Sequence, residues 1–185
     1  GLTNVMTRIE QFSAAGDPAR CLELARQFVR GKIRNARVML MRNHIEPPPG
    51  AIKRLKGAAD DDVLTSTSIA GLLGIEGAAA RLYFEHFSGM LKPGESHAMA
   101  ENPDDGIAAA PGNESRPAMT FDFERRNRRP PRDPVNALLS LSYSLLAKDC
   151  TVAALAVGFD PYVGFYHQPR HGRPALALDI MEEFR

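Results

Sequence analysis

The chain has 185 residues, of which 44% are hydrophobic and 24% charged, and a formal net charge of +1. This length predicts one compact domain over residues 1–185, and the composition excludes a disordered chain and a disulfide scaffold. Cys21 and Cys150 lie far apart and belong to no Cys/His cluster. They indicate reduced core thiols of a cytoplasmic protein and argue against a zinc site.

The first half of the sequence predicts helices. Apolar residues recur at helical spacing over residues 4–12 and 18–43, and an Asp-Pro pair supplies the start signal of the second helix. The three prolines at positions 47–49 are expected to end that helix, because proline removes backbone donors. A further helical region is expected over residues 60–91, with Glu76 in its middle.

The second half also predicts helices, after a break. Residues 92–118 are dominated by Pro, Gly, Asn, Asp and Ser, which is typical of a flexible surface loop. Helical segments are then expected over residues 134–148, 151–157 and 175–184, the last opened by an Arg-Pro pair. Since no hairpin or repeat pattern is visible, the sequence predicts an all-α fold.

Neither a membrane span nor a targeting segment is predicted. The apolar run over residues 135–159 is interrupted by Lys148 and Asp149, so each uninterrupted piece is too short to cross a bilayer. The N-terminus lacks a charged start followed by an apolar stretch. Gly1 in place of an initiator Met, and the abrupt end at Arg185, lead us to expect that the chain is part of a longer polypeptide.

Four residues form a candidate metal site. Asp179 and Glu182 are three residues apart on the predicted last helix, so their side chains project from one face. His167 precedes them across a loop that can return its imidazole to the start of that helix. Glu76 lies between two glycines in an otherwise apolar helix, where an unpaired charge is costly. Carboxylates with one imidazole favour Mg²⁺ or Mn²⁺, the imidazole shifting the preference toward Mn²⁺.

Each of these signals also has an ordinary explanation. Two acids at this spacing are usually a solvated helix face, and a lone histidine is usually a core or surface residue. Glu76 could pair with Arg81 or with an arginine from another helix. The constellation therefore needs independent support.

Support comes from segments that follow one another in a fixed order along the chain, at residues 74–84, 127–140, 158–167 and 176–184. Together they resemble the CRISPR spacer-acquisition integrase family, specifically its helical C-terminal domain without the N-terminal β-rich dimerisation domain. In that family the Glu, His and Asp of these motifs bind the catalytic metal. The resemblance thus implies Glu76, His167 and Asp179 as metal ligands, with Glu182 as a further acidic residue of the catalytic set.

The resemblance also implies an activity. Such an enzyme is a metal-dependent DNA endonuclease and integrase that joins the 3′-hydroxyl ends of prespacer DNA to the leader-proximal CRISPR repeat by transesterification. The implied partners are double-stranded DNA, a second copy of the chain, a small ferredoxin-like adaptation protein bridging two dimers, and in some members a prespacer-trimming nuclease. A DNA-binding scaffold subunit of the same complex remains the alternative. A metal-carboxylate oxidoreductase is disfavoured because paired Glu-x-x-His motifs are lacking.

Two basic patches are candidates for contact with DNA phosphates, which positions DNA without reading its sequence. The first is an arginine run stiffened by two prolines and made of Arg125, Arg126, Arg128, Arg129 and Arg132. The second lies on the 18–43 helix and consists of Lys32, Arg34, Asn35 and Arg37. A solvated helix face, or an intramolecular brace against Asp122, Glu124 and Asp133, is the competing interpretation.

Overall fold

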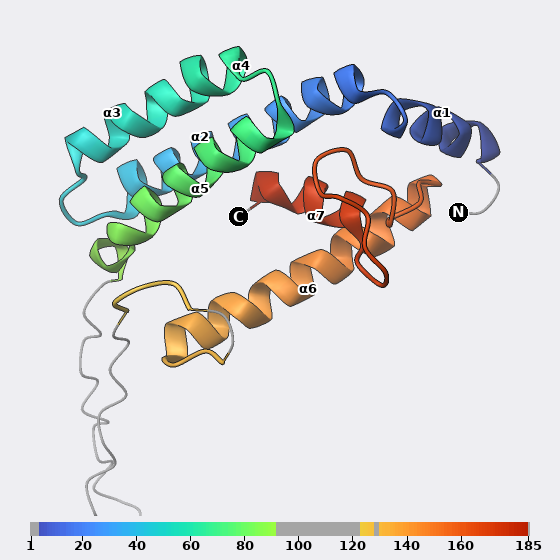
Figure 1. Ribbon diagram of the computed structural model, residues 1–185. Helices are drawn as coiled ribbons and strands as arrows, with labels where there is room; N and C mark the ends of the chain where they lie inside the picture. Colours follow the sequence, from blue (N-terminus) through green and yellow to red (C-terminus); the bar gives the residue numbers. More distant parts are fainter. Residues whose placement is uncertain (1–3, 92–122, 128–129, 185) are drawn as a thin grey trace, which may run out of the picture.

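The computed structural model describes residues 4–91, 123–127 and 130–184 (Figure 1). In these ranges the regular elements are all helices, and the only extended pairing is an isolated bridge between Arg170 and Arg173. The all-α prediction is therefore confirmed. The loop expected over residues 92–118 lies outside the described residues.

The first two helices begin where the sequence signals predict. Helix α1 spans Val5–Ala15, three residues beyond the predicted end, and helix α2 spans Pro18–Asn43. The Asp17 side chain accepts hydrogen bonds from the backbone N–H groups of the first turn of α2, and Pro18 occupies its first position. A cap that satisfies free donors, followed by a residue already fixed in helical φ, explains this sharp start.

The region after α2 departs from the prediction. The prolines do separate α2 from the next helix, but Pro49 also opens that helix, α3 (Pro49–Gly57), which the sequence analysis missed. This helix continues through the π-helix η1 (Ala58–Asp62) into the short α4 (Val63–Thr65).

The expected single helical region over residues 60–91 is broken after α4. Helix α5 (Ile69–Glu85) restarts at Ser68, whose hydroxyl accepts the Gly71 N–H at 3.1 Å, and the 3₁₀-helix η2 (Phe87–Met90) comes after it. Serine competes with helical hydrogen bonding and favours caps, so the Ser-Thr-Ser run ends one helix and begins the next.

The two segments predicted at 134–148 and 151–157 are one continuous helix, α6 (Pro134–Val157). Lys148 and Asp149 do not interrupt it, because both are exposed. By length and apolar content α6 could cross a bilayer, but one such helix is weak evidence, and α7 packs on it. The helix ends at Gly158, whose φ of 107° lies in the left-handed region that glycine adopts freely.

The chain ends with helix α7 (Ala175–Met181), which continues as the 3₁₀-helix η3 (Glu182–Phe184). In Figure 1, α3 and α5 accompany α2, while α7 lies between this group and α6. The main core forms between α2, α3, η1 and α5 and also contains Tyr166, whereas a smaller core joins α6 to α7. Since η3 packs against α2, the last residues of the chain meet the centre of the helical group.

Candidate functional site

Two of the four predicted site residues converge on one lysine. The ammonium of Lys32, from the middle of α2, lies 2.6 Å from Oε2 of Glu182 and also pairs with Oε1 of Glu76. The Glu182 side chain is 2% exposed and that of Glu76 is 16% exposed. The structure thus joins α2, α5 and η3 through one buried charge cluster, named here the Lys32 cluster, of Lys32, Glu76 and Glu182.

Tyr166 supports this cluster from within the core. Its side chain is buried, and its hydroxyl donates a 2.6 Å hydrogen bond to Oε2 of Glu76. Burial, together with the hydrogen bond to Glu76, raises the pKa of Tyr166. The hydroxyl therefore remains protonated and fixes one oxygen of Glu76 as an acceptor. Sequence analysis missed this residue, because a tyrosine beside a histidine carries no signal of a distant glutamate partner.

Asp179 faces away from the cluster, toward the loop that precedes α7. The side chain is 0% exposed, and its Oδ2 accepts the backbone N–H groups of Phe165 and Tyr166 at 2.6 and 3.0 Å. Its Oδ1 lies 2.8 Å from both the backbone nitrogen and Nδ1 of His167. Both oxygens of Asp179 are thereby engaged. The carboxylate predicted as a metal ligand thus contacts the loop and orients the imidazole, leaving Nε2 directed to the Glu182 side.

The loop before His167 is fixed by two further contacts. A Cβ atom on Gly164 would lie 2.7 Å from Oδ2 of Asp179 and 2.8 Å from the backbone of Ala175, so only glycine allows this approach. On the α1 side, the Gln11 amide donates to the carbonyls of Asp160 and Val163 at 2.8 and 2.7 Å. After His167 the exposed segment 168–172 turns through Gly172, with φ of 68°, and closes through the Arg170–Arg173 bridge.

The spacing on the imidazole side suits a divalent ion. Nε2 of His167 and Oε1 of Glu182 are 3.7 Å apart, which is too long for a hydrogen bond. It is shorter than twice a metal–ligand bond of about 2.1 Å, so one ion fits between the two atoms. In the part of the chain that the structure describes, however, no three His, Cys, Asp or Glu side chains are gathered at metal-binding spacing. The Lys32 ammonium separates Glu76, the third donor, from the other two.

The cluster opens onto a cavity of about 780 Å³ with charges of both signs in its lining. Its lining contains the carboxylates of Glu76 and Glu182, the imidazole of His167, and the arginines Arg126, Arg170 and Arg173. An acidic group that suits a metal ion, placed beside arginines that suit phosphate, provides for both halves of a metal–phosphodiester complex. Neither Arg170 nor Arg173 was singled out from the sequence; each stands in a short polar turn without helical periodicity.

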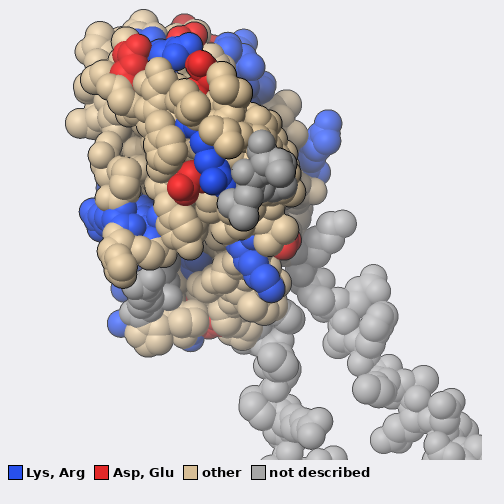
Figure 2. All heavy atoms as spheres, turned by 90° about the vertical axis from the view of Figure 1, so that its right-hand side faces the viewer, with Lys and Arg blue, Asp and Glu red and all other residues tan. Residues whose placement is uncertain are grey.

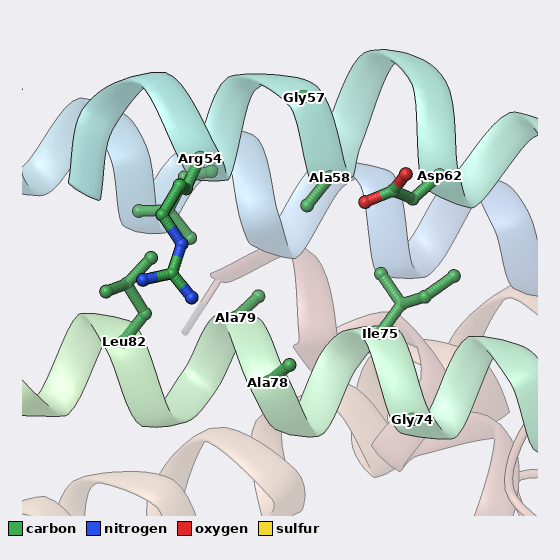
Figure 3. Close-up of a pocket in the computed structure, with 10 residues that line it drawn as sticks. Arg54, Gly57, Ala58, Asp62, Gly74, Ile75, Ala78, Ala79 and Leu82 are labelled. Atoms are coloured by element: carbon green, nitrogen blue, oxygen red, sulfur yellow. The ribbon is translucent and has the colours of Figure 1, made fainter. Parts of the chain in front are cut away.

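A second cavity, of about 520 Å³, separates α3 and η1 from α5 (Figure 3). Figure 3 shows Arg54 and Asp62 on one wall, and Ile75, Ala79 and Leu82 on the other. Its lining includes no histidine and none of the predicted site residues. The constellation expected from the sequence therefore belongs to the first cavity.

The second predicted DNA-binding patch, on α2, is not a solvated basic stripe. Lys32 is buried in the cluster, which corrects its expected position on the surface. Arg34 forms a 2.7 Å ion pair with Asp60, and this hydrogen bond lowers the pKa of the Asp60 carboxyl. The Asn35 amide donates to the backbone carbonyl of Glu183, and Arg37 is half-buried. Much of the positive charge of α2 is thus directed to the protein itself.

The members of the arginine run differ in their exposure and in their partners. Arg126 donates to Oδ1 of the buried Asn136 at 2.7 Å and lies over the Tyr143 ring, 5.5 Å from its centroid. It is therefore braced within the protein while also lining the large cavity. Arg125 and Arg132 are exposed, and Arg128 and Arg129 lie outside the described residues. On the face drawn in Figure 2, lysines and arginines form several separate groups, not one continuous patch.

Comparisons with known proteins show the family of this chain. A family model described as CRISPR associated protein Cas1 matches residues 1–185. The chain is 47% identical, over its whole length, to a CRISPR-associated exonuclease Cas4/endonuclease Cas1 fusion of Geobacter sulfurreducens, of which it covers 30%. It is 44% identical, over 98% of its length, to a CRISPR-associated endonuclease Cas1 of Thermus thermophilus, of which it covers 46%.

A solved structure is also similar, a partial Cas6-RT-Cas1–Cas2 complex. Its matched chain gives a TM-score of 0.77 at 28% identity, over 98% of this chain and 47% of that one. The chain thus spans less than half of each of these proteins. With the family model matching throughout and the helical fold shared, the chain belongs to the CRISPR-associated Cas1 family.

Proposed function

We propose that this chain is the catalytic helical domain of a divalent-metal-dependent DNA endonuclease and integrase of CRISPR adaptation. In this proposal it joins the 3′-hydroxyl ends of prespacer DNA to the leader-proximal CRISPR repeat. The observation that carries the proposal is the large cavity, where Glu76, His167 and Glu182 face the same space as Arg126, Arg170 and Arg173. The Cas1 relatives, which are named endonucleases, support the same class of reaction.

The proposed metal ligands are Glu76, His167 and Glu182. Two carboxylates and an imidazole suit Mn²⁺ or Mg²⁺. When bound, such an ion supplies polarisation of the scissile phosphate and offsets charge in the transition state. Asp179 holds the His167 imidazole in place, and Tyr166 holds Glu76, so both act as positioning residues.

The proposed reaction needs no covalent intermediate with the protein. A prespacer 3′-hydroxyl oxygen forms a bond to the phosphorus of the repeat, and the bond from that phosphorus to its former 3′ oxygen breaks. The attacking hydroxyl loses a proton and the leaving oxygen gains one. Because Nε2 of His167 is assigned to the ion and Nδ1 lies against Asp179, the proton passes to and from water in the open cavity. Water in place of the 3′-hydroxyl would give cleavage.

The proposed partners are double-stranded DNA, a second copy of the chain, a small ferredoxin-like protein bridging two dimers, and a prespacer-trimming nuclease, all in the cytoplasm. The similar solved assembly contains Cas2, and the Geobacter relative is fused to a Cas4 exonuclease. These facts concern those proteins and support the proposal for this one. Arg170 and Arg173 are the proposed phosphate contacts nearest the metal, while Arg125 and Arg132 are exposed for contacts farther along the DNA.

A strand-transfer assay with Mn²⁺ tests the function. Glu76→Ala and His167→Ala are expected to lower the rate at least about 100-fold while DNA binding persists, because each removes a group from the reacting site. Glu85→Ala, an exposed acid at the end of α5, serves as the control. Full activity in either site variant would refute the catalytic assignment and leave the scaffold alternative.

A further inference from the structure

We propose that Lys32 neutralises Glu76 and Glu182, two of the three proposed metal ligands, in the protein without metal, and that it withdraws from them when the ion binds. This inference rests on the metal-dependent function proposed above. It assigns to Lys32 a role in metal exchange, where the sequence had suggested contact with DNA. Lys32 does not react; it positions two carboxylates and competes for them.

The first support is the place of the ammonium. Lys32 reaches from α2 to carboxylates on two other elements, Glu76 on α5 and Glu182 on η3. All three side chains are largely buried, and Lys32 itself is 8% exposed. Two carboxylates brought together away from water repel each other and lose hydration, so a cation between them is required for this packing. In the metal-free protein Lys32 supplies that charge.

The second support is that the ammonium and a metal ion compete for the same two carboxylates. Nζ of Lys32 is 2.6 Å from Oε2 of Glu182, and an ion held by Glu76 and Glu182 would need oxygens at about 2.1 Å. Two cations on the same oxygens would lie within a few ångströms and repel strongly. The third donor cannot close on the ion while the ammonium stands between them.

The third support is that the structure offers a route for the ion to enter and space for the lysine to move away. Glu182 presents its other oxygen, Oε1, to His167 Nε2 across 3.7 Å, so an ion can enter there without first removing Lys32. Lys32 also lines a separate cavity of about 160 Å³ with Tyr83, Phe84 and Tyr143. An ammonium that moved into this space would lie among aromatic rings, which attract cations. The flexible lysine stem therefore has space to leave the carboxylates and remain attached to the site.

Metal affinity separates exchange from simple positioning. Mn²⁺ binding is measured by isothermal titration calorimetry on metal-free protein for the wild type, Lys32→Met, Lys32→Arg and Arg42→Met. We expect Lys32→Met to bind Mn²⁺ at least about tenfold more tightly than the wild type, because no ammonium must be displaced. Lys32→Arg retains the competing charge and should bind no more tightly than the wild type. Arg42→Met removes an exposed charge from the end of α2 and should leave affinity unchanged.

Thermal unfolding provides the second readout. Metal-free Lys32→Met should unfold at a lower temperature than the wild type, since its carboxylates lack a counter-charge, and Mn²⁺ should raise its melting temperature by more. If Lys32→Met does not fold without metal, Lys32→Gln, which keeps a hydrogen-bond donor, replaces it in both measurements. Mn²⁺ affinity in the neutral variant equal to or weaker than that of the wild type would overturn the exchange. Absence of Mn²⁺ binding by folded wild type would instead refute the proposed metal-dependent function.

Discussion

Asp179 and Glu182 stand three residues apart at the end of the chain, yet they face two different regions of the molecule. Asp179 turns toward the loop 160–167 and accepts from three backbone N–H groups and an imidazole. Glu182 turns toward the cavity, where its neighbours are the end of a lysine and the other side of the same imidazole. Asp179 is held mainly by backbone N–H groups, which cannot move away from it. Glu182 is held by the end of a lysine side chain, which can.

This difference distinguishes a carboxylate with a structural role, Asp179, from one available for chemistry, Glu182, although the two are only three residues apart. Backbone donors are fixed by the chain, so a carboxylate that they saturate has no capacity for a ligand. An ammonium on a long stem can be displaced, so a carboxylate that it neutralises is stored in a form ready for another cation. Substitutions in the two regions test this contrast.

The largest expected effect is on stability, from loss of the loop-side carboxylate. Asp179→Ala leaves buried donors of the loop without an acceptor, so the free energy of unfolding should fall by about 3–5 kcal/mol. Urea denaturation measures it. Asp149→Ala, an exposed acid on α6, should change it by less than about 0.5 kcal/mol. Similar effects of the two substitutions would refute the structural role assigned to Asp179.

The cavity-side carboxylate should instead affect activity. Glu182→Gln removes the charge that a metal requires, and we expect strand transfer with Mn²⁺ to fall at least about 100-fold. The adjacent Glu183 is exposed, so Glu183→Gln is a matched control that should retain activity. Equal activity in the two variants would contradict the assignment of Glu182 as a ligand.

A smaller effect is expected from the hydrogen bond that holds Glu76. Tyr166→Phe removes only the hydroxyl, which should lower the free energy of unfolding by about 1 kcal/mol and weaken Mn²⁺ binding several-fold. Tyr162→Phe, at an exposed position, should change neither quantity. An unchanged Mn²⁺ affinity in Tyr166→Phe, measured by calorimetry, would show that Glu76 does not depend on this contact.

The smallest expected effect is on how stability depends on pH. It comes from Asp133, another carboxylate held by several hydrogen bonds. Hydrogen bonds from Asn136 lower the pKa of Asp133 at the start of α6. A lowered folded-state pKa means that this contribution to stability is fully present above the unfolded value of about 3.9 and is lost as pH falls through the folded value. Urea unfolding from pH 2 to 6 should therefore show a steeper acid loss for wild type than for Asp133→Asn, which still caps the helix. Identical slopes would exclude Asp133 as a contributor.

The sequence predicted the helices that have local start and stop signals. The Asp-Pro start of α2 and the Arg-Pro entry to α7 are examples, because caps and proline act within one turn. The prediction failed where the continuity of a helix depends on which of its sides the rest of the protein covers. Lys148 and Asp149 looked like an interruption, but α6 leaves that side exposed and continues. Proline likewise ends one helix and begins another, and only the second effect was missed at Pro49.

The candidate site was predicted in membership better than in roles. The motifs implied Glu76, His167 and Asp179 as ligands with Glu182 beside them; the structure places Glu76, His167 and Glu182 on one cavity and Asp179 behind the imidazole. Spacing of three residues places Asp179 and Glu182 on neighbouring sides of a helix, but it cannot say which side meets the loop. Lys32 was assigned to the surface for a related reason. A helical pattern locates a charged residue on the polar face, and only the packing of α5 and η3 shows that this face is covered.

The contact between Asp179 and the backbone of His167 also affects how the protein can vary. The imidazole is anchored directly to α7, so its position does not depend on the path of residues 168–172, which are exposed and closed by their own bridge. We therefore expect insertions in that turn to leave the histidine in place. Between Gly164 and His167 the chain has no such freedom, because every residue added there would change which N–H group reaches the carboxylate.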